Sequence, residues 1–138
     1  MAGFGVIFDM DGVLVDSQES HYWSWRELGR RHGVPFERPL FDRTFGMHNA
    51  QIVPIWLERP VEPAELSRLA DEKEALFRRH VQSRIQPLPG ARHLVESLSD
   101  AGVPLAVGSS GPRLNVETLL EGLHLRPRFQ ALVTGDDV

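Results

Sequence analysis

The stretch GVIFDMDGVLVDS, residues 5–17, decides the fold of this chain. Its apolar run Val6–Phe8 leads directly into Asp9 and Asp11, and Gly12 then turns the chain. Acidic residues are depleted in strands, and two close negative charges repel each other. A buried strand that ends in two carboxylates therefore predicts a site that uses negative charge. In open α/β sheets, ligands bind at the carboxyl ends of the strands.

Two more apolar runs predict further strands, so that strands are expected at Phe4–Phe8, Val103–Gly108 and Ala131–Gly135. None of the three alternates polar and apolar residues, as expected of parallel strands covered on both faces. Apolar residues at helical spacing start at Ala91 and at Val116, and Gly102 is expected just after the first of these helices. Ser110 is expected to cap the second helix, with Pro112 in its first turn. The order predicts an α/β doubly wound (Rossmann-like) parallel sheet.

Residues 17–86 interrupt this alternation and have helical patterns throughout. Asp16 and Glu19 have the spacing of a capping box and predict a helix that ends near Gly33. Residues 49–58 and 62–84 predict two more helices. The expected organisation is a core at 1–16, an inserted α-helical subdomain at 17–86 and the rest of the core at 87–138. The tryptophans of the insertion are expected in its apolar core: Trp23, Trp25 and Trp56.

Composition excludes several classes of protein. The 138 residues include no cysteine, which excludes disulfides and thiolate metal sites. The net charge of −4 argues against a nucleic-acid partner. No apolar stretch approaches the ~20 residues of a membrane span, and no signal peptide is recognisable. We therefore expect a cytoplasmic protein without a membrane or nucleic-acid partner.

The aspartate pair has simpler interpretations than catalysis. Asp11-Gly12 alone is a common turn signal, but a turn leaves Asp9 unexplained. An EF-hand loop would place Ile7 and Gln18 at ligand positions that neither residue can fill. A magnesium site fits better, because Mg²⁺ prefers oxygen ligands and can contact a substrate phosphate directly. One carboxylate can then attack phosphorus, and the second can act as general acid and base.

The segment AVGSSGPR, residues 106–113, predicts the phosphate-binding part of the same site. Ser109 ends a strand where a helix begins, and a hydroxyl with backbone N–H groups at a helix N-terminus binds anions.

Together, these segments resemble the haloacid dehalogenase-like phosphatases. FDMDGVLVDS is similar to their motif I, AVGSS is similar to their motif II, and the helical insertion matches a cap inserted after motif I. The resemblance implies that Asp9 is the nucleophile and a Mg²⁺ ligand. It implies that Asp11 is the general acid/base and a Mg²⁺ ligand through its backbone carbonyl. It assigns phosphate binding to Ser109, Ser110 and Gly12. The DGV sequence favours the β-phosphoglucomutase-like and sugar-phosphate phosphatase branch.

The resemblance also implies substrate contacts in the helical insertion. His21 follows the first connection, and in mutase-like relatives a histidine at this position helps to couple cap closure to substrate contact. The segment TFGMHN, residues 44–49, resembles the specificity loop of the cap. The candidates from this region are Gly46, His48 and Asn49, with Arg43 beside them.

The family pattern also requires a lysine after the third strand and an acidic residue after a fourth strand. No lysine follows Lys73. Asp136 and Asp137 come just before the last residue of the sequence, Val138, and in the family such a pair resembles a turn more than a metal site. We therefore expect the 138 residues to form the N-terminal part of a longer enzyme, with the C-terminal part of the same protein as partner. The 138 residues alone are expected to have impaired activity.

Several functions stay open at this stage. The first is a Mg²⁺-dependent phosphomonoesterase that acts on a small phosphorylated metabolite. The second is a phosphomutase of the β-phosphoglucomutase type, and the third is a non-catalytic remnant. A dehalogenase ranks lower, because it does not need the Asp11 acid/base.

Overall fold

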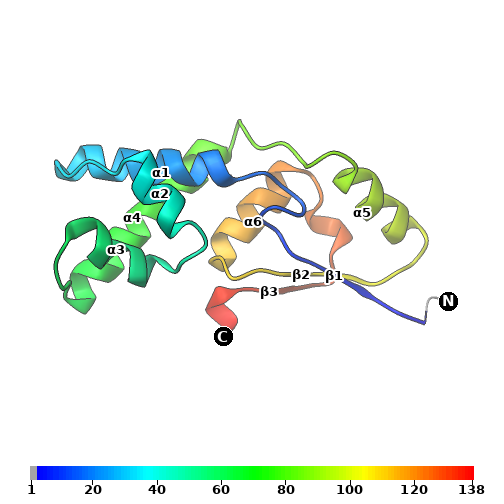
Figure 1. The fold of residues 1–138 in the computed structure, drawn as a ribbon. Helices are drawn as coiled ribbons and strands as arrows, with labels where there is room; N and C mark the ends of the chain where they lie inside the picture. The colour runs from blue at the N-terminus through cyan, green and yellow to red at the C-terminus, as the bar shows by residue number, and fades with distance from the viewer. Residues whose placement is uncertain (1–2) are drawn as a thin grey trace. The chain divides into compact units, whose positions relative to one another are not determined.

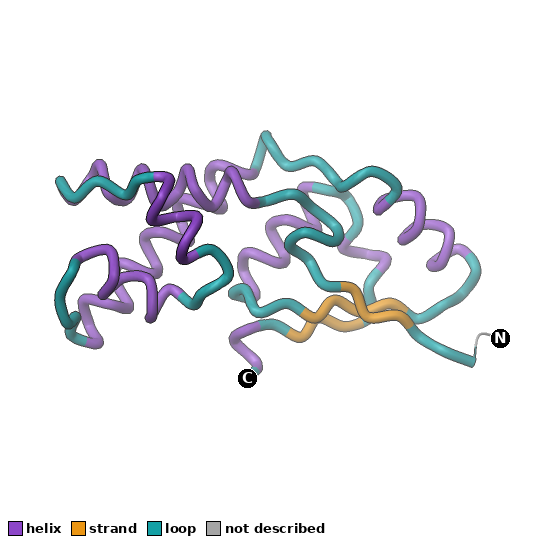
Figure 2. Tube along the Cα trace, in the orientation of Figure 1, coloured by secondary structure: helices purple, strands orange, loops and turns teal. Residues whose placement is uncertain are grey.

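The computed structural model describes residues 3–138 and confirms the α/β fold with a parallel sheet (Figures 1 and 2). Its strands are β1 (Val6–Phe8), β2 (Leu105–Gly108) and β3 (Ala131–Val133), in the order β1-β2-β3. Phe8 pairs with Val107, and Val107 pairs with Leu132. Each predicted strand is present, but shorter than its apolar run.

Five helices lie in predicted regions with changes at their ends, whereas α2, at Arg38–Thr44, was not predicted as a separate helix. The elements are α1 (Gln18–His32), α2 (Arg38–Thr44), α3 (Asn49–Leu57), α4 (Pro63–Val81), α5 (Ala91–Asp100), α6 (Arg113–Gly122) and the short 3₁₀ helices η1 (Arg126–Arg128) and η2 (Gly135–Asp137). Helix α1 ends before Gly33 as predicted, but it begins at Gln18, so Ser17 rather than Asp16 precedes it. Gly102 follows α5 with a φ of 77°, which confirms its predicted position beyond the helix end.

The chain forms two compact units. The sheet unit consists of residues 3–18 and 81–138, and the helical unit consists of residues 19–80. The predicted insertion at 17–86 contains the whole helical unit, whereas residues 81–86 group with the sheet. The two connections between the units run side by side, because Val15 forms an antiparallel bridge with Pro87 and Leu88 N–H donates to the Leu14 carbonyl at 2.9 Å.

Residues 3–138 cover the sheet on one face, whereas coverage on both faces was expected. Helices α5 and α6 lie on the same side of the sheet (Figure 1). On that side the row Phe8, Val107 and Leu132 is buried. On the other side Ile7 is 75% exposed and Val133 is 54% exposed. The reason is topological: two right-handed crossovers that step in the same direction put both connecting helices on one face.

The helical unit has a core rich in aromatic residues. Trp25 stacks on Phe36 with ring centroids 4.9 Å apart, and Trp56 lies edge-on to Trp25 at 6.2 Å. The Trp56 indole N–H donates to the Val34 carbonyl at 3.0 Å. This confirms Trp25 and Trp56 as core residues. Trp23 is half-buried and stacks on His80.

Candidate active site

The predicted site residues of the sheet unit follow neighbouring strand ends. Asp9 comes directly after β1, Ser109 directly after β2 and Thr134 directly after β3. Because the three strands are parallel and paired in this order, their carboxyl ends lie along one edge of the sheet. This is the edge at which open α/β sheets bind ligands.

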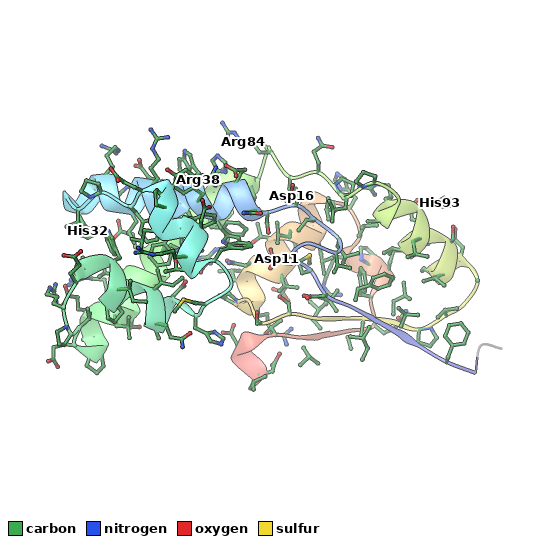
Figure 3. The ribbon with its side chains drawn as sticks, in the orientation of Figure 1. Asp11, Asp16, His32, Arg38, Arg84 and His93 are labelled. Atoms are coloured by element: carbon green, nitrogen blue, oxygen red, sulfur yellow. The ribbon has the colours of Figure 1, made fainter. Side chains whose placement is uncertain are left out.

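The loop after β1 presents its two aspartates outward. Met10 is fully buried, whereas Asp9 and Asp11 on either side of it are exposed. The Met10 carbonyl accepts hydrogen bonds from the N–H groups of Leu14 and Val15, which closes a tight turn. Figure 3 shows Asp11 and Asp16 on this segment between β1 and α1. The buried methionine anchors the loop, so that the carboxylates face solvent.

Hydrogen bonds orient both carboxylates. The backbone N–H of Met10 donates to Asp9 Oδ1 at 2.7 Å. The Ser17 hydroxyl donates to Asp11 Oδ1, and Ser17 is only 2% exposed. Sequence reasoning did not select Ser17. The turn at Gly12, where φ is 77°, reverses the chain and brings Ser17 close to Asp11.

The loop after β2 differs from the prediction at the start of its helix. Helix α6 begins at Arg113, and Pro112 holds the position before it, so the predicted cap at Ser110 and the predicted first-turn place of Pro112 are wrong. The hydroxyl of Ser109 accepts the Gly111 N–H at 3.2 Å. The first N–H of α6, that of Arg113, donates to Asp136 Oδ2 at 2.8 Å. A carboxylate from a distant segment thus takes the place of a local cap.

Asp136 and Asp137 have protein partners at the end of β3. Asp137 Oδ2 accepts the Thr134 N–H at 2.7 Å, the Thr134 hydroxyl at 3.0 Å and Arg113 Nη2 at 2.8 Å. The hydrogen bonds from Thr134, followed by the charge of Arg113, hold the pKa of Asp137 below its ordinary value. These contacts tie both acids to the loop at residues 109–113 and to the turn after β3.

The acidic pair after β1 fits a magnesium ion in its donor chemistry. Exposed Asp9 and Asp11 supply carboxylate and carbonyl oxygens, the ligand type that Mg²⁺ takes, and Mg²⁺ usually keeps several waters. Within residues 3–138, no group of three or more His, Asp or Glu side chains is placed to hold a metal. The residues therefore fit a magnesium site to which Asp9 and Asp11 each contribute an oxygen ligand.

In the helical unit, His21 lies beside a buried lysine that sequence reasoning did not select. The His21 ring stacks on Phe77 with centroids 4.0 Å apart, and its Nδ1 is 2.8 Å from Lys73 Nζ. Lys73 is 2% exposed and also donates to Glu74 Oε1 at 3.1 Å. A signal was available: Lys73 lies four residues from both Leu69 and Phe77, in the middle of an apolar stripe.

The remaining candidates cluster around the α2–α3 loop. Gly46 lies in this loop with a φ of 91°, and His48 precedes α3, its N–H donating to Gln51 Oε1 at 3.2 Å. Asn49 Nδ2 donates to Glu74 Oε1 at 2.7 Å. Arg43 is exposed on α2. A substrate role for these residues stays a prediction.

The comparisons with known proteins agree with the sequence resemblance. The chain is 29% identical to the phosphorylated carbohydrates phosphatase of Thermotoga maritima, over 96% of this chain and 62% of that protein. It is 30% identical to the fructose-1-phosphate phosphatase of Escherichia coli (97% and 70%) and 27% identical to the beta-phosphoglucomutase of Bacillus subtilis (93% and 59%). The chain thus spans about 60–70% of the length of these relatives.

The solved structures agree as well. A HAD hydrolase of family IA, variant 3, from Entamoeba histolytica superposes with a TM-score of 0.86 at 27% identity, and the match covers 96% of this chain and 61% of that one. Within residues 3–138, no helix combines the length and the apolar character needed to cross a membrane. The model of the haloacid dehalogenase-like hydrolases matches residues 5–138, and the chain therefore belongs to this family.

Proposed function

We propose that this chain carries the nucleophile and phosphate-binding loop of a Mg²⁺-dependent phosphomonoester hydrolase for small phosphorylated metabolites such as sugar phosphates. The observation that carries the proposal is the placement of exposed Asp9 and Asp11 after β1 and of Ser109 after the adjacent strand β2. The names of the two phosphatase relatives support the substrate class. We expect the protein to act in the cytoplasm.

In the proposed reaction, a carboxylate oxygen of Asp9 attacks phosphorus and the ester oxygen leaves, which forms an aspartyl-phosphate. Asp11 gives its proton to the leaving oxygen and then takes a proton from the water that hydrolyses the aspartyl-phosphate. The Ser17 hydroxyl, bonded to Asp11 Oδ1, sets the direction of that carboxyl group. The Ser109 hydroxyl, which accepts the Gly111 N–H, keeps its own hydrogen for a phosphate oxygen.

Magnesium would be held by the Asp9 carboxylate and the Asp11 backbone carbonyl. When bound, it neutralises the charge of the transferring phosphoryl group. No lysine follows Lys73, and the described residues have no strand after β3 that could carry the distal acid of the family. We propose that full activity needs these groups from the C-terminal part of the family fold, because losing one charge-stabilising donor costs on the order of 10²–10³ in rate.

The test is phosphate release from a panel of phosphate esters, with and without Mg²⁺, by the intact gene product. We expect Mg²⁺-dependent turnover of sugar phosphates that falls at least about 10³-fold in Asp9→Asn. Asp16→Asn, a change of another exposed acid on the same segment, is the matched control and should keep turnover. Turnover that survives Asp9→Asn would exclude Asp9 as nucleophile, and a wild-type protein without turnover would favour a non-catalytic role.

The similarity to the beta-phosphoglucomutase of Bacillus subtilis supports a second candidate, a phosphomutase that uses the same two aspartates. The two candidates differ in the acceptor of the phosphoryl group, which is water for a phosphatase and a sugar hydroxyl for a mutase. Isomerisation of a sugar phosphate primed with glucose 1,6-bisphosphate, measured against phosphate release, separates them. Isomerisation faster than phosphate release would replace the first proposal.

A further inference from the structure

The end of β3 lies against the loop after β2. The Gly135 N–H donates to the Gly111 carbonyl at 2.9 Å. A Cβ atom at position 135 would lie 2.3 Å from the Ser110 carbonyl oxygen, closer than real Cβ contacts allow. The two segments therefore approach each other backbone to backbone, and only glycine fits at position 135.

Arg113 joins the same two segments through its main chain and its side chain. Its N–H donates to Asp136 Oδ2, and its Nη2 donates to Asp137 Oδ2 at 2.8 Å and to the Leu132 carbonyl at 3.0 Å. Asp137 in turn is fixed by two hydrogen bonds from Thr134. We call this set of residues the Arg113 clamp: Arg113, Thr134, Gly135, Asp136 and Asp137.

Hydrogen bonds to β3 and to the residues after it hold both ends of a short loop. At its first end, the Ser109 N–H donates to the Val133 carbonyl at 2.9 Å. At its second end, Arg113 is bonded to Asp136 and Asp137. Between these ends, the Ser109 hydroxyl and the Gly111 N–H are bonded to each other and have their positions set by the backbone. Donors that are already in position bind a charged group without the cost of reorganising.

We propose that Arg113, Gly135 and Asp137 are positioning residues that keep the Ser109–Gly111 segment in the shape that binds the substrate phosphate. This inference rests on the proposed phosphatase or mutase function of the same site. It assigns a role to the GDD sequence at 135–137 that is neither metal binding nor catalysis.

The direction in which Asp137→Asn changes the affinity for phosphate distinguishes a positioning role from a purely electrostatic one. Asp137→Asn removes a negative charge near an anion-binding loop, so electrostatics alone predicts tighter binding of inorganic phosphate. Positioning predicts weaker binding, because the asparagine cannot accept the three hydrogen bonds of Asp137 as strongly. We expect the inhibition constant for phosphate and the KM for substrate to rise about threefold to tenfold, with a smaller change in kcat.

Glu117→Gln is the matched control. Its carboxylate lies 4.0 Å from Arg113 Nη1 and belongs to the same helix, so this change removes the same charge while keeping the hydrogen bonds of Arg113 to Asp136 and Asp137. Its phosphate inhibition constant should stay within about twofold of wild type. Arg113→Gln should resemble Asp137→Asn, and Arg113→Lys, which keeps a charge and one donor, should recover part of the loss. An unchanged or lower inhibition constant in Asp137→Asn would overturn the proposal.

A measurement without substrate distinguishes failure of this proposal from failure of the proposed function. The Arg113 amide proton, bonded to Asp136, should exchange slowly in wild type and at least about tenfold faster in Asp136→Ala, a readout that needs no turnover. Addition of inorganic phosphate should shift the amide resonances of Ser110 and Gly111 in wild type and shift them less in Asp137→Asn. Exchange rates and phosphate-induced shifts in the variants that equal those of wild type would refute the positioning role of the clamp. A wild-type protein that binds phosphate but hydrolyses no ester would refute only the proposed function.

Discussion

The helical unit and the sheet unit differ in how completely they enclose their side chains. The helical unit surrounds Trp25, Phe36 and Trp56 on all sides, and it also encloses a charged pair, Lys73 and Glu74. The sheet unit leaves Ile7 and Val133 exposed on one sheet face, and its charged clamp is also exposed at the surface. Substitutions of the same chemistry should therefore have large effects at these enclosed positions of the helical unit and small effects at the exposed positions of the sheet unit.

Removal of the buried lysine should have the largest effect on stability. Lys73→Met removes the ammonium group that lies 3.1 Å from the Glu74 carboxylate, in a place where Glu74 is 8% exposed. Breaking a buried pair in this way costs about 3–5 kcal/mol. Urea unfolding of Lys73→Met and of the double variant with Glu74→Gln measures the effect.

The double variant should be more stable than Lys73→Met alone, because it removes the buried negative charge together with the positive one. Arg128→Gln is the surface control, since the Arg128–Asp100 pair of the sheet unit is exposed and should contribute no more than about 1 kcal/mol. Equal losses in Lys73→Met and Arg128→Gln would contradict the enclosure of the lysine.

A pair of isosteric substitutions sharpens the comparison for apolar side chains. Val53 in α3 is fully buried, whereas Val133 in β3 is 54% exposed. Val53→Thr puts a hydroxyl into the aromatic core and should cost about 1–3 kcal/mol. Val133→Thr keeps the β-branched shape on the open sheet face and should change the free energy of unfolding by less than about 0.5 kcal/mol. Denaturant titration of both variants checks the difference, and a loss of more than 1 kcal/mol in Val133→Thr would mean that the sheet face is covered in solution.

The sequence allowed prediction of the parts that local patterns encode. The three strands, the helical insertion and the positions of Asp9, Asp11 and Ser109 follow from apolar periodicity and from the residues after each strand. The open sheet face could not be predicted. A three-residue apolar strand such as Ala131–Val133 is compatible with cover on one face or on both. Coverage depends on the direction of the crossovers, which is a property of the whole topology.

Contacts between distant segments were the part of the site that could not be predicted. The cap of α6 comes from Asp136, 23 residues away from Arg113, so a search for a local cap selected Ser110. One partner of His21 is Lys73, 52 residues away. Such pairs depend on tertiary packing, and local sequence patterns do not show which distant residues come into contact.

The smallest predicted effect concerns two exposed carboxylates, one in each unit, whose pKa is lowered by different donors. In the helical unit, hydrogen bonds from Arg30 and then Arg31 lower the pKa of Glu27 to about 2. In the sheet unit, the backbone N–H of Thr134 is the main cause of the lowered pKa of Asp137. In both cases the stabilisation is present above the ordinary pKa of the carboxyl and is lost as the pH falls through the lowered value.

Salt should separate the two carboxylates. The Debye length falls from about 10 Å at 0.1 M salt to about 3 Å at 1 M, which weakens the attraction of exposed guanidinium groups. The Thr134 donors are neutral dipoles, and their hydrogen bonds to Asp137 do not depend on ionic strength in this way. Carboxyl-carbon NMR titration at both salt concentrations should therefore show the pKa of Glu27 rising toward 4.5 and that of Asp137 moving less. A larger salt shift at Asp137 than at Glu27 would show that Arg113, rather than Thr134, sets its charge state.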